Sequence, residues 1–514
     1  MSARTLVFRF LFAGLAVLAS ADALGSPPLS YDDARHLLNR TGFGATASEI
    51  DRYVGLSREQ AARKLLDGVR TTALTPPPAW TAEGGPLRYP RPGGNASEME
   101  RKLFQQEQVR EGLELRGWWV SEMLATPSPL TERMTLFWHN HFVSSQQKVR
   151  LALLMYRQNV TLRANALGNF GDLLHAVARD PAMVVYLDSA QNRKGTPNEN
   201  FAREVMELFT LGEGHYAEQD IKEAARAFTG WSIDRDSGRF MFRRFIHDDG
   251  VKTVLGKSGN FDGDEVLDIL LAQPATAEFV VRKLWREFVS PDPDEQEVSR
   301  IARRFRDARY DIKAALNDIF TSDAFYAKES RASLVKSPID LVVGTLRQFN
   351  MAPSEPTPFA VAAAGMGQNL FSPPNVKGWP GQETWINTSS LLARKQFLER
   401  LFRGDDPSRM AALPRAESMA PEMPRQALQP QGELDPEKAR QIRFMRAMER
   451  GMQSVQFDSA KWMSQVSSAP DPARRAADAE RVLLATAPQA EPDAPGDPLA
   501  LVRSLVLDAA YQLK

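Results

Sequence analysis

Two short segments of the chain carry the side chains best suited to chemistry. The first, residues 136–142, reads Leu-Phe-Trp-His-Asn-His-Phe and holds two of the six histidines, His139 and His141. On a regular helix, residues two positions apart point about 200° away from each other, so these rings could share a metal ion only where the helix has ended. His141 lies on the apolar face and is expected to point inward, whereas His139 points toward the opposite side. Each is either a buried histidine bonded to a carbonyl or carboxylate, or a metal ligand or general acid–base group.

The second segment carries Glu204 and Glu207, a spacing that lets two helical carboxylates reach one point. With an inward histidine nearby, they could bind a divalent metal ion or act as an acid–base pair, and Arg203 could orient them or bind an anionic substrate group. The same residues also suit a solvated helix face, because Arg203 lies four positions from both Glu199 and Glu207, the spacing of ordinary ion pairs. The sequence leaves both interpretations open. The candidate metal ligands are His139, His141, Glu204 and Glu207.

Two other groups of residues give weaker indications. Residues 247–252, His-Asp-Asp-Gly-Val-Lys, could contribute a ligand from a loop, but Asp-Gly favours a hairpin turn for backbone reasons alone. Trp379 and Trp385, in a loop rich in proline and glycine, could stack on a sugar, although burial is the commoner outcome for loop aromatics. The sequence contains no Gly-rich phosphate loop, no Gly-x-Ser-x-Gly elbow and no His-Glu-x-x-His motif.

The helix that should position the glutamates has strong sequence signals. Residues 196–199 have the pattern of a capping box, with Pro197 at the first helical position. Gly212 is expected to end this helix. Residues 46–49 and 57–60 form two similar capping boxes near the start of the chain. One face of the predicted helix is apolar and the other polar, so one side should pack while the other meets water or a site.

The composition limits the classes of protein to which the chain can belong. The chain has 514 residues, 43% of them hydrophobic, which is enough for a sizeable core. Lys+Arg and Asp+Glu balance at 64 each, so net charge gives no reason to expect nucleic acid as a partner. The chain has no cysteine, which excludes disulfides, thiolate catalysis and cysteine-ligated metal sites.

The N-terminus has the three parts of a secretory signal peptide. Arg4 and Arg9 come first, residues 10–19 form a short apolar run, and small residues at alternate positions lead to Ala23. The run is too short to span a membrane comfortably. We therefore expect residues 1–23 to be removed on export, leaving a periplasmic or secreted protein without a stable membrane anchor.

The rest of the chain reads as mostly α. Residues 28–403 are expected to form a large multi-helix core domain with a loop insertion near 72–96. Residues 239–255 resemble the one convincing β-hairpin. Residues 371–381 cannot be helical and should form a shaped loop. Further on, residues 404–497 read as a mobile, low-complexity and partly helical insertion, and residues 498–514 as a final helix that docks on the core.

Several segments, in this order, resemble one bacterial family. They are residues 136–142, 198–212, 228–231 and 373–380, and they look like the family called domain of unknown function 1800. The resemblance extends from about Ser30 to Arg403 and returns in the last helix. It implies an exported, mostly helical protein, often encoded beside a second exported family that would be a partner. No catalytic residue is established for the family, so none is carried over.

Two functions are compatible with these observations. The first is an exported hydrolase with a polar pocket between a helix at 129–142 and the helix at 197–211, acting on a cell-envelope or environmental polymer. His141, Glu204, Glu207 and Arg203 would be its catalytic residues. The second is a non-catalytic helical scaffold that binds the companion exported protein, in which the same residues form a buried ion-pair network.

Overall fold

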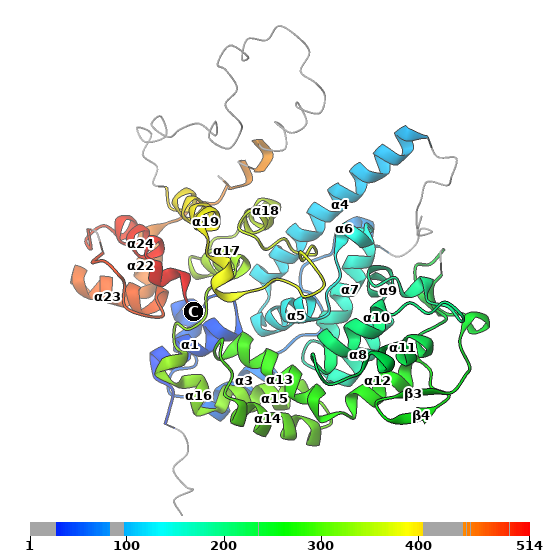
Figure 1. Ribbon diagram of the computed structural model, residues 1–514. Coiled ribbons are helices and arrows are strands. Elements are labelled where there is room, and N and C mark those ends of the chain that lie inside the picture. Colours follow the sequence, from blue (N-terminus) through cyan, green and yellow to red (C-terminus); the bar gives the residue numbers. More distant parts are fainter. Residues whose placement is uncertain are drawn as a thin grey trace, which may run out of the picture.

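A computed structural model describes most of the chain (Figure 1). It covers residues 27–82, 97–234, 236–403, 446–448, 450–452, 454–492 and 494–514. The signal peptide expected at residues 1–23 lies outside the described residues, as do parts of the segments 72–96 and 404–497. The prediction of a mostly α-helical protein is confirmed.

The helices pack around two large apolar clusters. The first cluster takes in α3 (Arg58–Asp67), α8 (Phe170–Ala178), α11 (Glu218–Ala227), α12 (Gly263–Leu271), α13 (Pro274–Phe288), α14 (Glu295–Asp307), α15 (Ile312–Thr321) and α16 (Asp323–Tyr326). The second takes in α4 (Glu98–Ala125), α17 (Pro338–Gln348), α18 (Thr357–Gly365), α19 (Thr388–Leu401), α22 (Ser459–Val466), α23 (Pro472–Leu483) and α24 (Pro498–Leu507). Other α-helices, most of which also contribute residues to the clusters, are α1 (Tyr31–Thr41), α2 (Ala47–Asp51), α6 (Gln146–Val149), α7 (Ala152–Asn165) and α9 (Pro181–Tyr186).

Helix α5 (Pro129–His141) lies where the two clusters meet. Trp138 belongs to the first cluster and Leu136 to the second, so this helix is buried on nearly every side. Pro129 begins it, as expected for a proline at the first helical position. Because α5 is buried on nearly every side, neither His139 nor His141, near its C-terminal end, faces solvent.

The glutamate helix differs from the prediction. It begins as α10 (Asn200–Glu204) and continues as a π-helix, η4 (Val205–Thr210), and no side-chain cap is formed at its start. Thr196 does not cap the helix, because it lies in an isolated β-bridge with Arg193. The predicted end is confirmed: Gly212, with a φ of 82°, takes the left-handed conformation that glycine allows.

The β-structure consists of two small antiparallel sheets. In the first, β1 (Trp231–Ile233) pairs with β2 (Phe240–Phe242); in the second, β3 (Lys252–Val254) pairs with β4 (Lys257–Gly259). The expected pairing of residues 239–246 with 251–255 is therefore wrong. Leu255 and Gly256, both with positive φ, make the two-residue turn of the second sheet instead.

The C-terminal helices pack against the start of the chain. Figure 1 shows α22, α23 and α24 in red beside the blue α1. Arg481 of α23 pairs with Asp32 of α1 at 3.2 Å, and Leu501 and Val502 of α24 are fully buried. Among the helices that the structure describes, none combines the length and apolar character needed to cross a membrane.

Candidate functional site

His141 joins two helices through both of its ring nitrogens. The residue is 3% exposed, its Nε2 lies 3.0 Å from Phe209 O, and its Nδ1 lies 3.1 Å from Lys283 Nζ. Because a carbonyl oxygen can only accept, Nε2 carries the proton and Nδ1 accepts from the lysine. Burial, followed by the charge of Lys283, holds the pKa of His141 well below its usual value. The ring is therefore neutral near pH 7.

Lys283 of α13 is a functional candidate that the sequence did not single out. Its Nζ also donates to Leu208 O at 3.1 Å and lies 4.8 Å from the centre of the Phe279 ring. Burial lowers its pKa to about 7. Together with His141, Lys283 supplies hydrogen bonds to carbonyls near the end of the π-helix, where a helix leaves its last acceptors unpaired. Its only sequence signal was a position on the flank of an apolar helix face.

His139 points elsewhere, as the helical geometry predicted, into an aromatic enclosure. It is 1% exposed and its ring centre lies 5.6 Å from Trp119, 5.5 Å from Phe371 and 5.6 Å from Trp379. Its Nε2 is buried and has no hydrogen-bond partner among the described residues. Burial, followed by the nearby Arg116, lowers the pKa of His139 to about 3. This histidine is a neutral member of the core.

The loop at residues 371–381 covers this enclosure and is non-helical, as expected. Asn140 holds it: its Oδ1 accepts from Trp379 N at 2.7 Å and its Nδ2 donates to Trp379 O at 3.4 Å. Trp379 and Trp385 are 4% and 7% exposed, so neither presents a ring face to a sugar at the surface. The alternative that these are buried loop aromatics is confirmed.

Glu204 and Glu207 share a half-buried face of α10 and η4. Burial, followed by the charge of Glu207, raises the pKa of Glu204, while Arg203 and Lys377 act in the opposite direction. The Tyr216 hydroxyl donates to Glu207 Oε2 at 2.9 Å. Burial and then Glu207 raise the pKa of Tyr216 to about 12. The two carboxylates are therefore electrostatically coupled in a partly desolvated place.

Arg203 takes part in a surface ion-pair network. It pairs with Glu199 at 3.2 Å, as the spacing predicted, and donates to both oxygens of Glu218 in α11, one of them at 3.0 Å. The ion pair with Glu207 that the spacing also allowed is not formed. Arg203 thus ties α10 to α11, and the alternative of a solvated face accounts for it.

Of the predicted site residues, the structure brings together Glu204 and Glu207. His141 bonds to Phe209 and Lys283, and His139 is enclosed by aromatic rings. In the described part of the chain, no group of three or more His, Asp and Glu side chains is arranged to hold a metal ion. What this arrangement can do chemically is donate and accept protons at the two glutamates.

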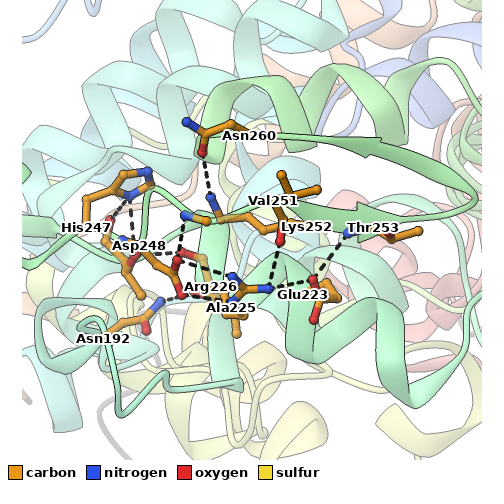
Figure 2. Close-up of polar contacts among 12 residues, drawn as sticks. Asn192, Glu223, Ala225, Arg226, His247, Asp248, Val251, Lys252, Thr253 and Asn260 are labelled. Carbon is orange, nitrogen blue, oxygen red and sulfur yellow. Dashed lines mark hydrogen bonds and ion pairs between the residues drawn. The ribbon is translucent and has the colours of Figure 1, made fainter.

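The segment after β2 forms a second polar network, shown in Figure 2. Arg226 lies between Asp248, at 2.8 and 3.2 Å, and Glu223, at 2.8 Å. The hydrogen bond from Arg226 is the main cause that lowers the pKa of Asp248 to about 2. His247 Nδ1 lies 2.8 Å from Thr229 O. Because these groups satisfy one another, the network fixes this segment on α11, and the hairpin turn that Asp-Gly suggested at 249–250 is not formed.

Comparison with known proteins gives one match. A family profile described as "Protein of unknown function (DUF1800)" matches residues 36–501, a range that includes most of both apolar clusters and the candidate site residues described in this subsection. No curated protein and no solved structure matches the chain.

Proposed function

This chain belongs to the DUF1800 family of proteins of unknown function, and from that premise we propose that it is a hydrolase in which Glu204 and Glu207 form the acid–base pair. One observation carries the proposal: the two carboxylates lie together on a half-buried face, and burial and mutual repulsion raise the pKa of Glu204. Pairs of titratable groups whose environments differ are typical of acid–base catalysis.

The environments suggest a role for each carboxyl group. Glu204, whose pKa is raised, keeps its proton to higher pH and donates it to the leaving group. Glu207, which accepts the Tyr216 hydroxyl hydrogen bond, takes a proton from the attacking water. Lys377, in the loop at 371–381, lies 3.7 Å from Glu213, and its charge lowers the pKa of Glu204; it would bind an anionic group of the substrate.

His141 has a different role in this proposal from the one that the sequence suggested. Its bond to Phe209 O lies two residues beyond Glu207, at the end of the π-helix. Helical irregularities of this kind are frequent at functional sites. His141 is therefore a positioning residue that fixes the segment bearing the base, and Lys283 assists it through Leu208 O.

The compartment expected from the N-terminal sequence narrows the range of substrates. If residues 1–23 act as an export signal, the protein is periplasmic or secreted, and the polymers of the cell envelope or of the surroundings are its substrates. A metal ion has no part in this proposal. Stoichiometric metal that is lost in a Glu204→Gln, Glu207→Gln double variant would overturn that feature and restore the metal alternative.

Hydrolysis of a panel of chromogenic esters and glycosides and of envelope polymers tests the proposal. Glu204→Gln and Glu207→Gln should each lower kcat about 100-fold or more on any substrate that the protein turns over. Glu199→Gln is the matched control, because it removes a nearby carboxylate whose ion pair, among the described residues, is with Arg203 alone. Equal activity in all three variants would contradict the assignment.

A second candidate function is the scaffold that binds a companion exported protein. It is favoured by three exposed apolar side chains in the segment from β2 to the start of β3: Phe242 at 46%, Phe245 at 81% and Val251 at 68%. Exposed apolar groups of this size close together in the chain are typical of binding surfaces. Co-purification of the companion, lost in a Phe245→Ser, Val251→Ser double variant and retained in Glu204→Gln, would support it.

A further inference from the structure

Five charged side chains meet where α5, α17 and α19 approach the C-terminal residues. We call this group the Asp340 cluster, and its members are Arg133, Lys336, Asp340, Arg394 and Lys514. Backbone contacts join the residues just before α17 to the C-terminal residues: Val335 forms a β-bridge with Leu513, and Lys336 N donates to Gln512 O at 2.8 Å. The cluster therefore links segments that are far apart in the sequence.

The cluster has one side-chain carboxylate, and that carboxylate is already occupied. Asp340 is 5% exposed and accepts from the Arg133 guanidinium and from Lys514 Nζ, the latter at 2.8 Å. Burial alone would raise the pKa of Asp340, but these two cations hold it far below its usual value. The second carboxylate in reach, Glu287, lies 3.3 Å from the same Arg133. Both acids are thus engaged by Arg133, and neither is free for another cation.

Lys336 and Arg394 are left with neutral partners. Arg394 is fully buried and donates to Lys336 O at 2.9 Å and Gln512 Oε1 at 3.1 Å, while its Nε has no hydrogen-bond partner in the part of the chain that the structure describes. Lys336 Nζ lies 3.7 Å from the centre of the Tyr511 ring. Within the described ranges, no carboxylate lies at ion-pair distance from either cation. The Nε of Arg133, which is 2% exposed, is also without a partner.

A buried cation without a counter-ion is unfavourable, and there are two ways to relieve it. Lysine can lose its proton, and burial does lower the pKa of Lys336 to about 7. Arginine cannot, because its guanidinium stays charged in proteins, so Arg394 keeps its charge whatever Lys336 does. An anion bound between them would neutralise both groups and give acceptors to the unpartnered N–H groups.

We propose that the Asp340 cluster binds a compact inorganic oxyanion, phosphate or sulfate, at Lys336 and Arg394. Guanidinium and ammonium groups are the partners that such anions take, because they offer several charge-assisted hydrogen bonds at once. The bound anion holds α19 and residues 512–514 on α17. This site is separate from the glutamate pair and does not depend on the proposed hydrolysis.

Thermal unfolding of the full chain in Tris chloride at pH 7 tests the site. Sodium sulfate or sodium phosphate replaces sodium chloride at constant ionic strength. We expect a saturable rise in Tm of about 2 to 5 °C with one or both anions, and none with acetate. If sulfate acted only by general salting-out, Tm would instead rise without saturation. A Tm that does not change, or that changes only linearly, overturns the proposal.

Two variants locate the effect. Lys336→Met should remove the saturable rise, whereas Lys395→Met, at an exposed lysine paired with Glu399 at 3.9 Å, should keep it. A saturable rise that persists in Lys336→Met places the anion elsewhere and refutes the assignment. If Lys336→Met does not fold, calorimetric titration of the unaltered protein with sulfate and phosphate decides the question, with one site per chain expected and no heat of binding as the refuting result.

Discussion

At the scale of single residues, the most informative side chain is His141. It is neutral and buried, it donates to Phe209 O and it accepts from Lys283. A ring held at both nitrogens in this way cannot also bind a metal ion or move a proton, so its contribution is to fix the geometry of the π-helix. The chemistry, if Glu204 and Glu207 perform it, takes place on the other face of the same turn.

Replacing His141 by leucine should therefore destabilise the fold. The change leaves Phe209 O without its donor and removes one acceptor of Lys283, so the free energy of unfolding should fall by about 1 to 3 kcal/mol. Urea denaturation measures this loss. His215→Leu, at an exposed position, is the control and should change stability by less than about 0.5 kcal/mol. Equal stability in both variants would show that the His141 bonds contribute nothing.

The wheel geometry of the sequence placed His139 and His141 on different sides of one helix, and this is what the structure has. It could not show that both sides are buried, because that follows from two apolar clusters that pack on α5 from segments far along the chain. Lys283 could not be predicted for the same reason: its partners come from α5 and η4, and no local pattern encodes them.

At the scale of elements, local signals succeeded where local contacts decide. The capping boxes predicted at residues 46–49 and 57–60 are both formed. The box predicted at residues 196–199 is not, because Asn192 Oδ1 accepts from Asn198 N at 2.9 Å and the bridge to Arg193 holds Thr196. The π-helix was also missed, since the apolar pattern is compatible with a regular helix.

The loop at 371–381 gives a prediction at this scale. Gly378 has a φ of 83°, and a Cβ there would lie 2.2 Å from Asn140 Oδ1 and 2.7 Å from Asn140 O. Gly378→Ala combines backbone strain with this clash and should lower the free energy of unfolding by at least about 2 kcal/mol. Gly381→Ala is the matched control: φ is 76° and nothing lies within 4 Å, so strain of about 1 kcal/mol is all that it adds. Similar losses in the two variants would contradict the role of Asn140.

At the scale of the whole molecule, two apolar clusters share α5, and charged groups are buried where they meet. The mostly α-helical class could be predicted because periodicity and caps recur along the chain. The second sheet shows the limit: Asp-Gly at 249–250 indicated a hairpin turn, but Arg226 and Thr229 hold that segment and the turn forms at Leu255 and Gly256. The charged groups that are buried where the two clusters meet likewise depend on tertiary contacts, which local sequence does not encode.

Burial of neutral histidines makes the stability of the whole chain depend on pH. Burial lowers the pKa of His36, His139 and His141 below the ordinary value near 6.5. The unfolded chain therefore binds more protons, and the stability from these rings is present above pH 6.5 and lost as the pH falls toward the folded values. Each ring contributes about 1.4 kcal/mol per pH unit once its unfolded form is protonated. Partly exposed His175, whose pKa Asp264 raises, opposes this trend weakly.

Urea denaturation between pH 7.5 and pH 4.5 should show the loss. His139→Phe gives the sharpest comparison, because the ring lies among Trp119, Phe371 and Trp379 and its Nε2 has no partner to lose. The variant should be about as stable as the parent at pH 7.5 and more stable at pH 5, with a slope lower by about 1.4 kcal/mol per pH unit. Parallel pH profiles would mean that His139 is protonated alike in the folded and unfolded chains, which a ring enclosed by aromatic side chains should not allow.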